Sequence, residues 1–351
     1  MDRKVRVLIW GFGAMGSGMA RMLLSKQGVE ICGVCDTHPD RKNRRLGDLL
    51  GAEAGEAADL VVQGNITELL DAAEKADIAL LATDSFTRGA FDKIMLLVSR
   101  GINVISTAEE MAYPRAGEPV LADKIDVAAR ENGVSVLGTG INPGLIMDLL
   151  VVLMTGACID VDHITARRVN SLSPFGPAVM EEQGVGLSPE AFRKGAADGS
   201  LAGHVGFNES VNMIADAVGW KLSRPVTQSM EPIVTTVARQ TPYASVKPGD
   251  VAGCDMRGSG WVGEEQKIQM VHPQQIEPEL EGTDTGDYVD IAGTPEIHLQ
   301  IKPEVPGGIG TIAMCVNMIP QVINASPGLK TMLDLPVPRA ILGDMRDRIE
   351  S

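Results

Sequence analysis

The stretch Val5-Arg6-Val7-Leu8-Ile9-Trp10-Gly11-Phe12-Gly13-Ala14-Met15-Gly16 decides the fold of this chain. Its apolar first half predicts a buried strand, its glycines predict a tight turn, and Ser17 to about Ser25 is expected to form a helix. Gly11 allows the turn, Gly13 lets a pyrophosphate approach the backbone, and Gly16 lets the helix pack against the strand. The helix N-terminus offers unpaired N–H groups to phosphates. We therefore predict a dinucleotide site formed by Gly11, Phe12, Gly13, Ala14, Met15 and Gly16.

A carboxylate at the end of the next predicted strand bears on the choice of cofactor. The strand Glu30–Cys35 ends at Asp36, twenty residues after Gly16, where a carboxylate can accept hydrogen bonds from the adenosine ribose. Asp36 favours NAD, because it repels the 2′-phosphate of NADP. The basic stretch His38–Arg45 is either a solvated helix face or a loop that holds this phosphate, with Arg41 at the cofactor. We expect the cofactor to be NAD or NADP, with a preference for NAD.

Composition excludes several classes of protein. A chain of 351 residues suggests two domains, and its net charge of −15 argues against binding nucleic acid or anionic membranes. We expect no membrane span and no secretory signal. The five widely spread cysteines are typical of a reduced, cytoplasmic protein. Cys32 and Cys35 fall in one predicted strand and face opposite sides of it, so we interpret them as packing residues. No residue pattern predicts a metal site.

The first part of the chain alternates apolar strands with helical segments, among them Ile66–Ala73. This alternation is typical of an α/β fold with a doubly wound parallel sheet, a Rossmann domain. The six predicted strands are Val5–Trp10, Glu30–Cys35, Leu60–Val62, Ile78–Thr83, Asn103–Ser106 and Val134–Leu137.

After an apolar helix at Leu145–Met154, the pattern changes to strands of antiparallel character and Gly/Pro loops, with a helical insert between Pro189 and Ala217. These features predict a second, α+β domain on a mixed or antiparallel sheet. The apolar segment Ile309–Ala325 is expected to be a helix that returns to the first domain. We therefore expect a cofactor domain at 1–145, a substrate and dimerisation domain at 146–305, and a returning helix and tail at 306–351. The second-domain strands expected are Ile159–Val169, Val234–Ala238, Lys267–Val271 and Glu296–Ile301.

Ligands of doubly wound sheets bind at the carboxyl ends of the strands, so the residues that follow each strand are site candidates. Thr83 and Ser85 follow one strand, and Thr107 follows the next. Asn142 and Pro143 follow the last. We expect all five to lie along the cofactor, with Asn142 also facing the substrate.

Glu109 and Glu110 indicate the chemistry, because they follow the strand beside which the nicotinamide is expected. A carboxylate repels an oxyanion but stabilises an ammonium or iminium cation, and it can accept the proton that an amine must lose before it gives up a hydride. The alternative is that both residues simply begin the next helical segment, which an acidic residue favours.

Two further residues are candidates for substrate binding. Arg167 and Arg168 are adjacent on a strand, so only one can face the cleft, where its guanidinium would bind a carboxylate. An ion pair at the sheet edge is the alternative. His272 ends a strand before Pro273, and it is either a site residue or a structural histidine.

Several of these segments resemble a known family. The runs Ile9–Ala20, Asn103–Pro114 and Gly140–Gly144 are similar to those of the 2,4-diaminopentanoate dehydrogenases, in the dihydrodipicolinate-reductase-like group that includes native amine dehydrogenases. The resemblance extends over essentially the whole chain. The His-His-x-x-Lys run of dihydrodipicolinate reductase is absent. Homoserine dehydrogenase has Asn-Lys where this chain has Glu109-Glu110.

The resemblance implies an activity and a set of roles. It implies NAD or NADP as cofactor, oxidation of an amine-bearing carbon to a ketone, and release of ammonia. It places the catalytic glutamate at Glu109, with Glu110 adjacent, and the substrate pocket at Arg168, His272 and Thr311. The substrate expected is 2,4-diaminopentanoate, with a simpler amine or another amino acid as the alternative. A non-catalytic NAD(P) sensor is a further alternative, against which Glu109 and Glu110 argue. We expect a homodimer.

Overall fold

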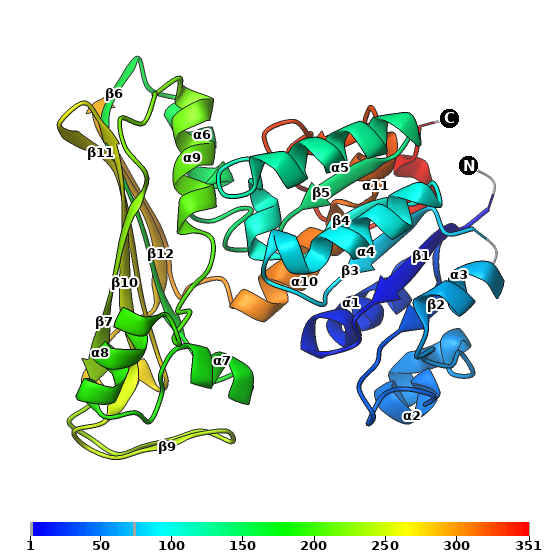
Figure 1. Cartoon of the computed structure of the whole chain (residues 1–351), viewed down its shortest axis with the longest axis horizontal. Coiled ribbons are helices and arrows are strands. Elements are labelled where there is room, and N and C mark those ends of the chain that lie inside the picture. Colours follow the sequence, from blue (N-terminus) through cyan, green and yellow to red (C-terminus); the bar gives the residue numbers. More distant parts are fainter. Residues whose placement is uncertain (1–2, 73–74, 351) are drawn as a thin grey trace. The chain divides into compact units, whose positions relative to one another are not determined.

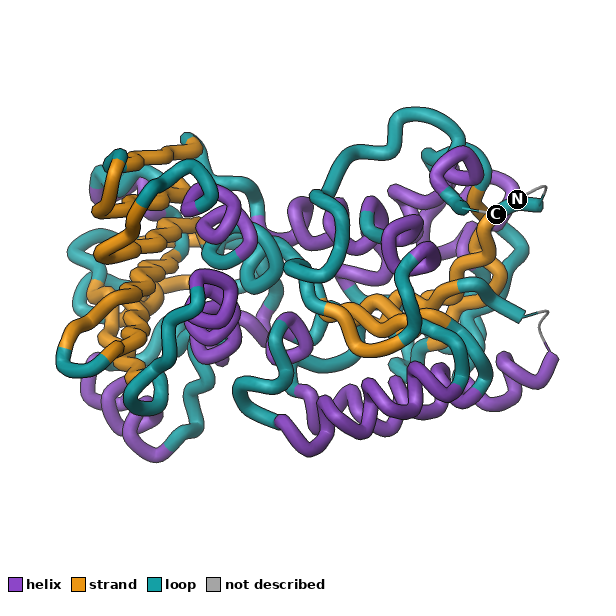
Figure 2. The backbone as a smooth tube through the Cα atoms, turned by 90° about the horizontal axis from the view of Figure 1, so that it is seen from above, coloured by secondary structure: helices purple, strands orange, loops and turns teal. Residues whose placement is uncertain are grey.

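The computed structural model describes residues 3–72 and 75–350. The chain divides into two compact units. The first combines Met1–Gly144 with Gly308–Ser351, and the second is Leu145–Gly307. Each unit is built on its own six-stranded sheet (Figures 1 and 2).

The sheet of the first unit is entirely parallel and has the strand order β14-β5-β4-β3-β1-β2. Its strands are mostly apolar and buried, as expected of a parallel sheet covered by helices on both faces. The predicted α/β class with a doubly wound parallel sheet is confirmed. The strands are β1 (Val5–Trp10), β2 (Val29–Cys35), β3 (Ile78–Leu81), β4 (Asn103–Ser106), β5 (Ser135–Gly138) and β14 (Gly328–Lys330).

The helices of this unit alternate with the strands. They are α1 (Ala14–Leu24), α2 (Leu46–Leu50), α3 (Ile66–Ala72), α4 (Thr87–Ser99), α5 (Pro119–Glu131), α10 (Gly307–Asn317) and α11 (Ile319–Asn324), with 3₁₀ turns η1 (Gly51–Ala57), η2 (Glu109–Ala112) and η4 (Met345–Arg348). The prediction of helix at Ile66–Ala73 ends on Ala73, which lies outside the described residues.

Three predictions in and beside this unit were wrong. Residues 60–62 do not form a strand, because only the isolated bridges Cys35–Gln63 and Arg45–Val61 form there. The sixth place in the sheet is taken instead by β14 from the C-terminal segment. The apolar run 309–325 is two helices, with Pro320 in the first turn of the second. The helix expected from Leu145 begins at Leu149, where Asp148 caps it through a 2.7 Å hydrogen bond from the Leu149 N–H.

The second unit has a mixed sheet of order β13-β12-β6-β11-β10-β7, in which only β6 and β11 pair in parallel. This confirms the predicted second α+β fold. Helices α6 and α9 lie on the same side of this sheet (Figure 1). The helices are α6 (Leu149–Thr155), α7 (Pro177–Glu182), α8 (Pro189–Asp198) and α9 (Phe207–Val218). The sheet strands are β6 (Asp160–Ser171), β7 (Thr227–Val234), β10 (Val251–Val262), β11 (Glu265–Gln275), β12 (Gly286–Thr294) and β13 (Ile297–Ile301), beside a hairpin of β8 (Arg239–Gln240) and β9 (Ser245–Val246) and a 3₁₀ turn η3 (Pro278–Glu281).

The sequence patterns missed β10 and β12 and placed a strand at Val234–Ala238, where β7 in fact ends. Glycines in β10 resemble loop residues, but their lack of a side chain allows close packing. A Cβ at Gly258 would lie 2.8 Å from the ring of Phe207, on α9. The packing of α9 on the sheet thus requires a glycine inside a strand.

Two other expectations from the sequence can be compared with the structure. Burial raises the pKa of the Cys32 and Cys35 thiols to about 11, which fits packing residues rather than a reactive pair. None of the helices in the described ranges is long and apolar enough to cross a membrane.

Candidate active site

The glycine turn between β1 and α1 has the geometry of a phosphate cradle. Gly11 adopts a φ of +94°, and a Cβ there would lie 2.3 Å from the carbonyl oxygen of Ala82. A Cβ at Gly16 would lie 1.8 Å from the Gly11 carbonyl oxygen. By contrast, a Cβ at Gly13, the N-cap of α1, would meet no atom within 4 Å. Two glycines are therefore required for packing, and the third leaves open space at the helix N-terminus.

Asp36 lies at the carboxyl end of β2 and is 8 % exposed. Its Oδ2 accepts hydrogen bonds from the Phe12 N–H (2.6 Å) and from Nε of Arg41 (3.1 Å), and its Oδ1 accepts one from the His38 N–H (2.7 Å). Burial alone would raise the pKa of Asp36, but these donors hold it below its usual value. The carboxylate is therefore ionised, and Oδ1 retains capacity for a further donor such as a ribose hydroxyl.

A pocket of about 500 Å³ lies at the ends of β1 and β2. Lys42 lines this pocket. Its stem packs closely over Gly64, where a Cβ would lie 2.1 Å from Cε of Lys42. Lys42 belongs to the basic stretch for which the sequence left open a role in holding the 2′-phosphate, whereas Asn65 had not been singled out. The pocket is lined by Trp10, Cys35, Thr37, Lys42, Asn43, Gln63, Gly64, Asn65, Ile66 and Glu68.

The open space at Gly13, the remaining acceptor on Asp36 and this pocket together fit a dinucleotide. Phosphates would lie at the N-terminus of α1, and adenosine would lie beside Asp36. Arg41 neutralises Asp36 in part, and Lys42 adds a second cation near the ribose. This arrangement explains why a carboxylate at this position need not exclude NADP.

Glu110, one of the two neighbouring glutamates of η2, caps a helix. Oε2 of Glu110 accepts a 2.7 Å hydrogen bond from the Thr87 N–H and so caps α4, and the Glu110 N–H donates to the Ser85 carbonyl (3.2 Å). The alternative considered from the sequence was that both glutamates begin the next helical segment. Glu110 does cap a helix, but that helix is α4. Glu109 and Glu110 are both half-buried.

The other predicted residues of the first unit surround the same strand ends. The Thr83 hydroxyl donates to Asp84, whose carboxylate also pairs with Lys93, and the Thr107 N–H donates to the Leu81 carbonyl at 3.0 Å. The Thr311 hydroxyl of α10 accepts a 3.2 Å hydrogen bond from the Ile141 N–H. Thr311 therefore holds the loop that carries Asn142 and Pro143.

In the second unit, Arg168 on β6 is 2 % exposed and forms an ion pair with Asp287 on β12, which is equally buried. Its Nη2 donates to the Val305 carbonyl (2.7 Å), and Asp287 Oδ2 accepts from the Val305 N–H (2.9 Å). Burial raises the pKa of Asp287, and the guanidinium opposes this effect. Arg167 lies on the opposite face of the sheet, 3.9 Å above the ring of Tyr288.

His272 on β11 is 2 % exposed, and its Nε2 lies 2.8 Å from Oδ1 of Asn170. Burial, with smaller effects of His204 and Arg168, holds the pKa of His272 well below its usual value, so the ring is neutral. Nε2 must then carry the proton that it donates to Asn170, which leaves Nδ1 as an acceptor. Nδ1 is buried and has no hydrogen-bond partner within the described part of the chain.

Sequence reasoning missed Asp287 and His204. Asp287 belongs to β12, whose alternating Tyr288, Val289 and Ile291 could have indicated a strand. His204 stacks edge-on against His272, with 4.7 Å between ring centroids, but it lies in a loop where no pattern indicated it. Among residues 3–72 and 75–350, no group of three His, Cys, Asp or Glu side chains could hold a metal ion.

The fold and the cradle define the class of this protein, an NAD(P)-dependent dehydrogenase of the Rossmann type. The chain belongs to the 2,4-diaminopentanoate dehydrogenase family. Residues 145–351 match the model of the 2,4-diaminopentanoate dehydrogenase C-terminal domain. The chain is also 64 % identical to the 2,4-diaminopentanoate dehydrogenase of Acetoanaerobium sticklandii, over 99 % of this chain and 97 % of that protein.

More distant relatives are amine dehydrogenases. The solved structure of amine dehydrogenase from Mycobacterium smegmatis matches with a TM-score of 0.86 and 26 % identity, covering 97 % of this chain and 99 % of that one. An amine dehydrogenase of Streptomyces virginiae is 24 % identical over 96 % of this chain and 98 % of its own length.

Proposed function

We propose that this protein catalyses the NAD(P)-dependent oxidative deamination of 2,4-diaminopentanoate to 2-amino-4-oxopentanoate and ammonia. The observation that carries the proposal is the 64 % identity with 2,4-diaminopentanoate dehydrogenase over nearly the full length of both chains. The residues are chemically suited to this reaction, because carboxylates follow β4 where many dehydrogenases place a cation.

Glu109 is the group proposed to act on the amine. It accepts a proton from the C4 ammonium, so that the free amine can lose hydride from C4. NAD(P), when bound, would supply the hydride acceptor. The resulting iminium is a cation, which the carboxylate side of η2 stabilises. Water then adds to the iminium carbon, and the carbinolamine loses ammonia to leave the ketone. Glu110 holds Glu109 in place through its bonds to Thr87 and Ser85.

Arg168 and His272 are proposed to bind the amino-acid end of the substrate. Arg168 uses Nη1 and Nη2 for Asp287 and Val305, and its Nε donates to no acceptor in the described part of the chain. A Cβ at Gly307 would lie 3.0 Å from the ring of Phe175 and 3.9 Å from Nη2, so a glycine allows close packing beside the guanidinium. A substrate carboxylate fits these donors, and the unpaired Nδ1 of His272 fits an N–H of the C2 ammonium. Thr311 and Asn142 are also proposed to bind the substrate.

A homodimer is proposed on the basis of the uncovered face of the second sheet. Ile164, Ala166 and Arg168 of β6 are buried on one face, whereas Thr165 and Arg167 on the other are half-exposed. A half-exposed sheet face is suited to pairing with a second copy. Light scattering at a single protein concentration tests this, and a monomer mass would contradict it. A cytoplasmic location is proposed because all five cysteines are unpaired thiols.

A comparison of substrates tests the proposed function. Initial rates of NAD⁺ reduction should be highest with 2,4-diaminopentanoate, low with 2,4-diaminobutanoate, and lowest with alkylamines that lack a carboxylate. A protein that prefers the alkylamine would instead be a dehydrogenase for simpler amines. A protein that binds NAD⁺ but oxidises none of these substrates would not be an amine dehydrogenase.

A further inference from the structure

A second pocket, of about 360 Å³, lies in the first unit far from the cofactor cradle along the sheet. It is formed by α11, by the segment that follows β14, and by η4. Strand β14 is one edge of the parallel sheet and β2, which carries Asp36, is the other. Five strand-to-strand steps separate these edges, a distance of about 24 Å. The pocket is therefore distinct from the cofactor site, and its size suits a small molecule.

Arginines without a carboxylate partner line this pocket. Most arginines of this acidic chain form ion pairs, for example Arg130 with Asp126 and Arg346 with Asp344. Arg339 and Arg348 are exposed residues that both line the pocket, and neither guanidinium forms an ion pair with a carboxylate of residues 3–72 or 75–350. Two unpaired guanidinium groups in one pocket are suited to a carboxylate ligand.

The same pocket presents acceptors for a cation. Gln321 of α11 is 7 % exposed, and its Oε1 is buried with no hydrogen-bond partner in the described part of the structure. A buried carbonyl oxygen without a donor is unfavourable, and a ligand N–H would satisfy it. Asp347 and Glu350 also line the pocket and add negative charge near it. The lining thus combines free cationic donors with an unpaired neutral acceptor and carboxylates.

We propose that this pocket binds a small zwitterion, an α-amino acid, as an accessory ligand of the enzyme. Its carboxylate pairs with Arg339 and Arg348, and its ammonium donates to Oε1 of Gln321 and lies near Asp347. A simple anion would leave Gln321 unpaired, and a simple amine would leave both arginines unpaired. None of the residues proposed for the reaction lines this pocket. The inference therefore does not depend on which amine is the substrate.

Equilibrium dialysis of the NAD⁺-bound enzyme tests the proposal, with labelled L-alanine as probe and labelled propanoate and n-propylamine as matched single-charge controls. L-alanine should bind saturably, and propanoate and n-propylamine should bind much more weakly. Arg348→Met and Arg339→Met should each weaken L-alanine binding by roughly tenfold or more, since each removes a charge-assisted hydrogen bond. Gln321→Leu should weaken L-alanine and leave the weak binding of propanoate unchanged.

Two control variants locate the binding. Arg193→Met, at an exposed arginine of α8 in the other unit, should leave L-alanine binding unchanged. Arg168→Met should leave unchanged the L-alanine binding that the Arg339 and Arg348 variants weaken. Loss of L-alanine binding in Arg168→Met but not in the Arg339 and Arg348 variants would overturn the proposal, because the amino acid would then occupy the substrate site. Equal binding of propanoate, or no saturation at tens of millimolar L-alanine, would overturn it as well.

Discussion

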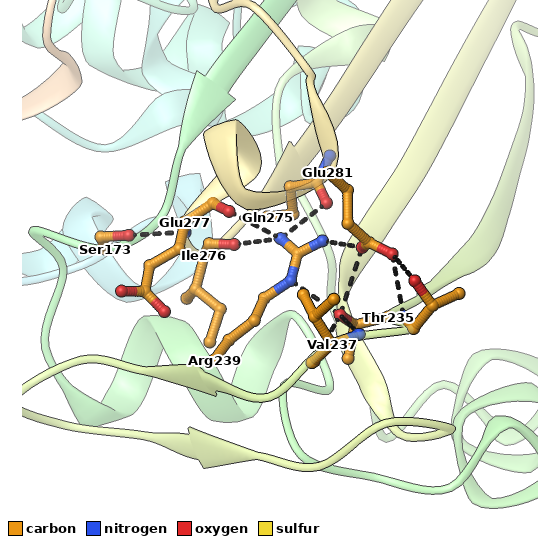
Figure 3. Close-up of polar contacts among 9 residues, drawn as sticks. Ser173, Thr235, Val237, Arg239, Gln275, Ile276, Glu277 and Glu281 are labelled. Carbon is orange, nitrogen blue, oxygen red and sulfur yellow. Dashed lines mark hydrogen bonds and ion pairs between the residues drawn. The ribbon is translucent and has the colours of Figure 1, made fainter.

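Arg239 and Arg168 are both buried arginines of the second unit, but the fold uses them differently. Arg239 has acceptors for all three guanidinium nitrogens, as Figure 3 shows. Its Nε donates to Thr235, Nη1 to Gln275 and to the carbonyls of Ile276 and Glu277, and Nη2 to Glu281. Hydrogen bonds from Thr236, with Arg239 contributing, lower the pKa of Glu281 to about 2. These hydrogen bonds of Arg239 stabilise the start of the β8–β9 hairpin.

Arg168 is equally buried but not saturated. It pairs with Asp287 and Val305 through two nitrogens and keeps Nε for a further acceptor. An arginine whose donors are all used by the protein stabilises the fold, whereas one with donors to spare is suited to a ligand. Burial alone therefore does not distinguish a structural arginine from a ligand-binding arginine, whereas the number of satisfied donors does.

The two glutamates of η2 give the largest expected effect. Glu109→Gln keeps the size of the side chain but removes the proposed proton acceptor. Turnover should fall by about 10²–10⁴ while NAD(P) still binds. Steady-state rates and cofactor titration by fluorescence measure the two quantities.

Glu110→Gln is the matched control. An amide oxygen can still accept the hydrogen bond from the Thr87 N–H, so turnover should change much less than in Glu109→Gln. A collapse of activity in Glu110→Gln with normal activity in Glu109→Gln would move the catalytic role by one residue. Full activity in both variants would remove the carboxylate from the mechanism.

Arg239→Met should act on stability. It leaves Glu281 without its ion pair and several carbonyls without a donor, which should lower the free energy of unfolding by on the order of 3 kcal/mol. KM for the substrate should be unchanged in the protein that remains folded. Urea unfolding followed by circular dichroism measures the first quantity. A variant as stable as the parent would show that the hydrogen bonds in Figure 3 do not contribute to the free energy of unfolding.

Arg168→Met should act on substrate binding. Loss of a charge-assisted hydrogen bond costs about 1.5–3 kcal/mol, so KM for the diamino acid should rise roughly tenfold or more. Cofactor affinity should stay the same, and alkylamines without a carboxylate should be affected far less. If KM is unchanged but stability falls as in Arg239→Met, Arg168 is a structural residue. If Arg167→Met raises KM instead, the other sheet face carries the site.

Asp36→Ser should give the smallest effect. It removes the charge that repels a 2′-phosphate but leaves Arg41 and Lys42, so the ratio of kcat/KM for NADP to that for NAD should rise. Because Arg41 already neutralises part of this charge, the shift should be modest, on the order of tenfold. An unchanged ratio would mean that Asp36 does not contact the ribose.

The glycine turn and the strand periodicity predicted the first unit well, because phosphate cradles and buried parallel strands depend on local sequence. The prediction of a strand at residues 60–62 was wrong, because an apolar triplet does not reveal whether a neighbouring strand is available to pair with it. β14 comes from near the C-terminus and packs beside β5, a long-range pairing that no local pattern encodes.

The partners of the candidate site residues could not be predicted. Arg168 and His272 were proposed from expected positions at strand ends, and these positions were wrong, because β6 continues to Ser171 and β11 to Gln275. Asp287, which pairs with Arg168, lies 119 residues away in a strand that was missed. The role of Glu110 as the cap of α4 depends on the contact between two strand ends. Such contacts depend on tertiary structure, which a single sequence does not display.

The reacting group is proposed to be an amine, and the reverse reaction tests this most directly. NADH or NADPH oxidation should be followed with 2-amino-4-oxopentanoate in the presence and absence of ammonia. We expect oxidation only when ammonia is present, with 2,4-diaminopentanoate as product. Oxidation of NAD(P)H without ammonia, giving a hydroxy acid, would contradict it, because the enzyme would then reduce ketones rather than iminium ions.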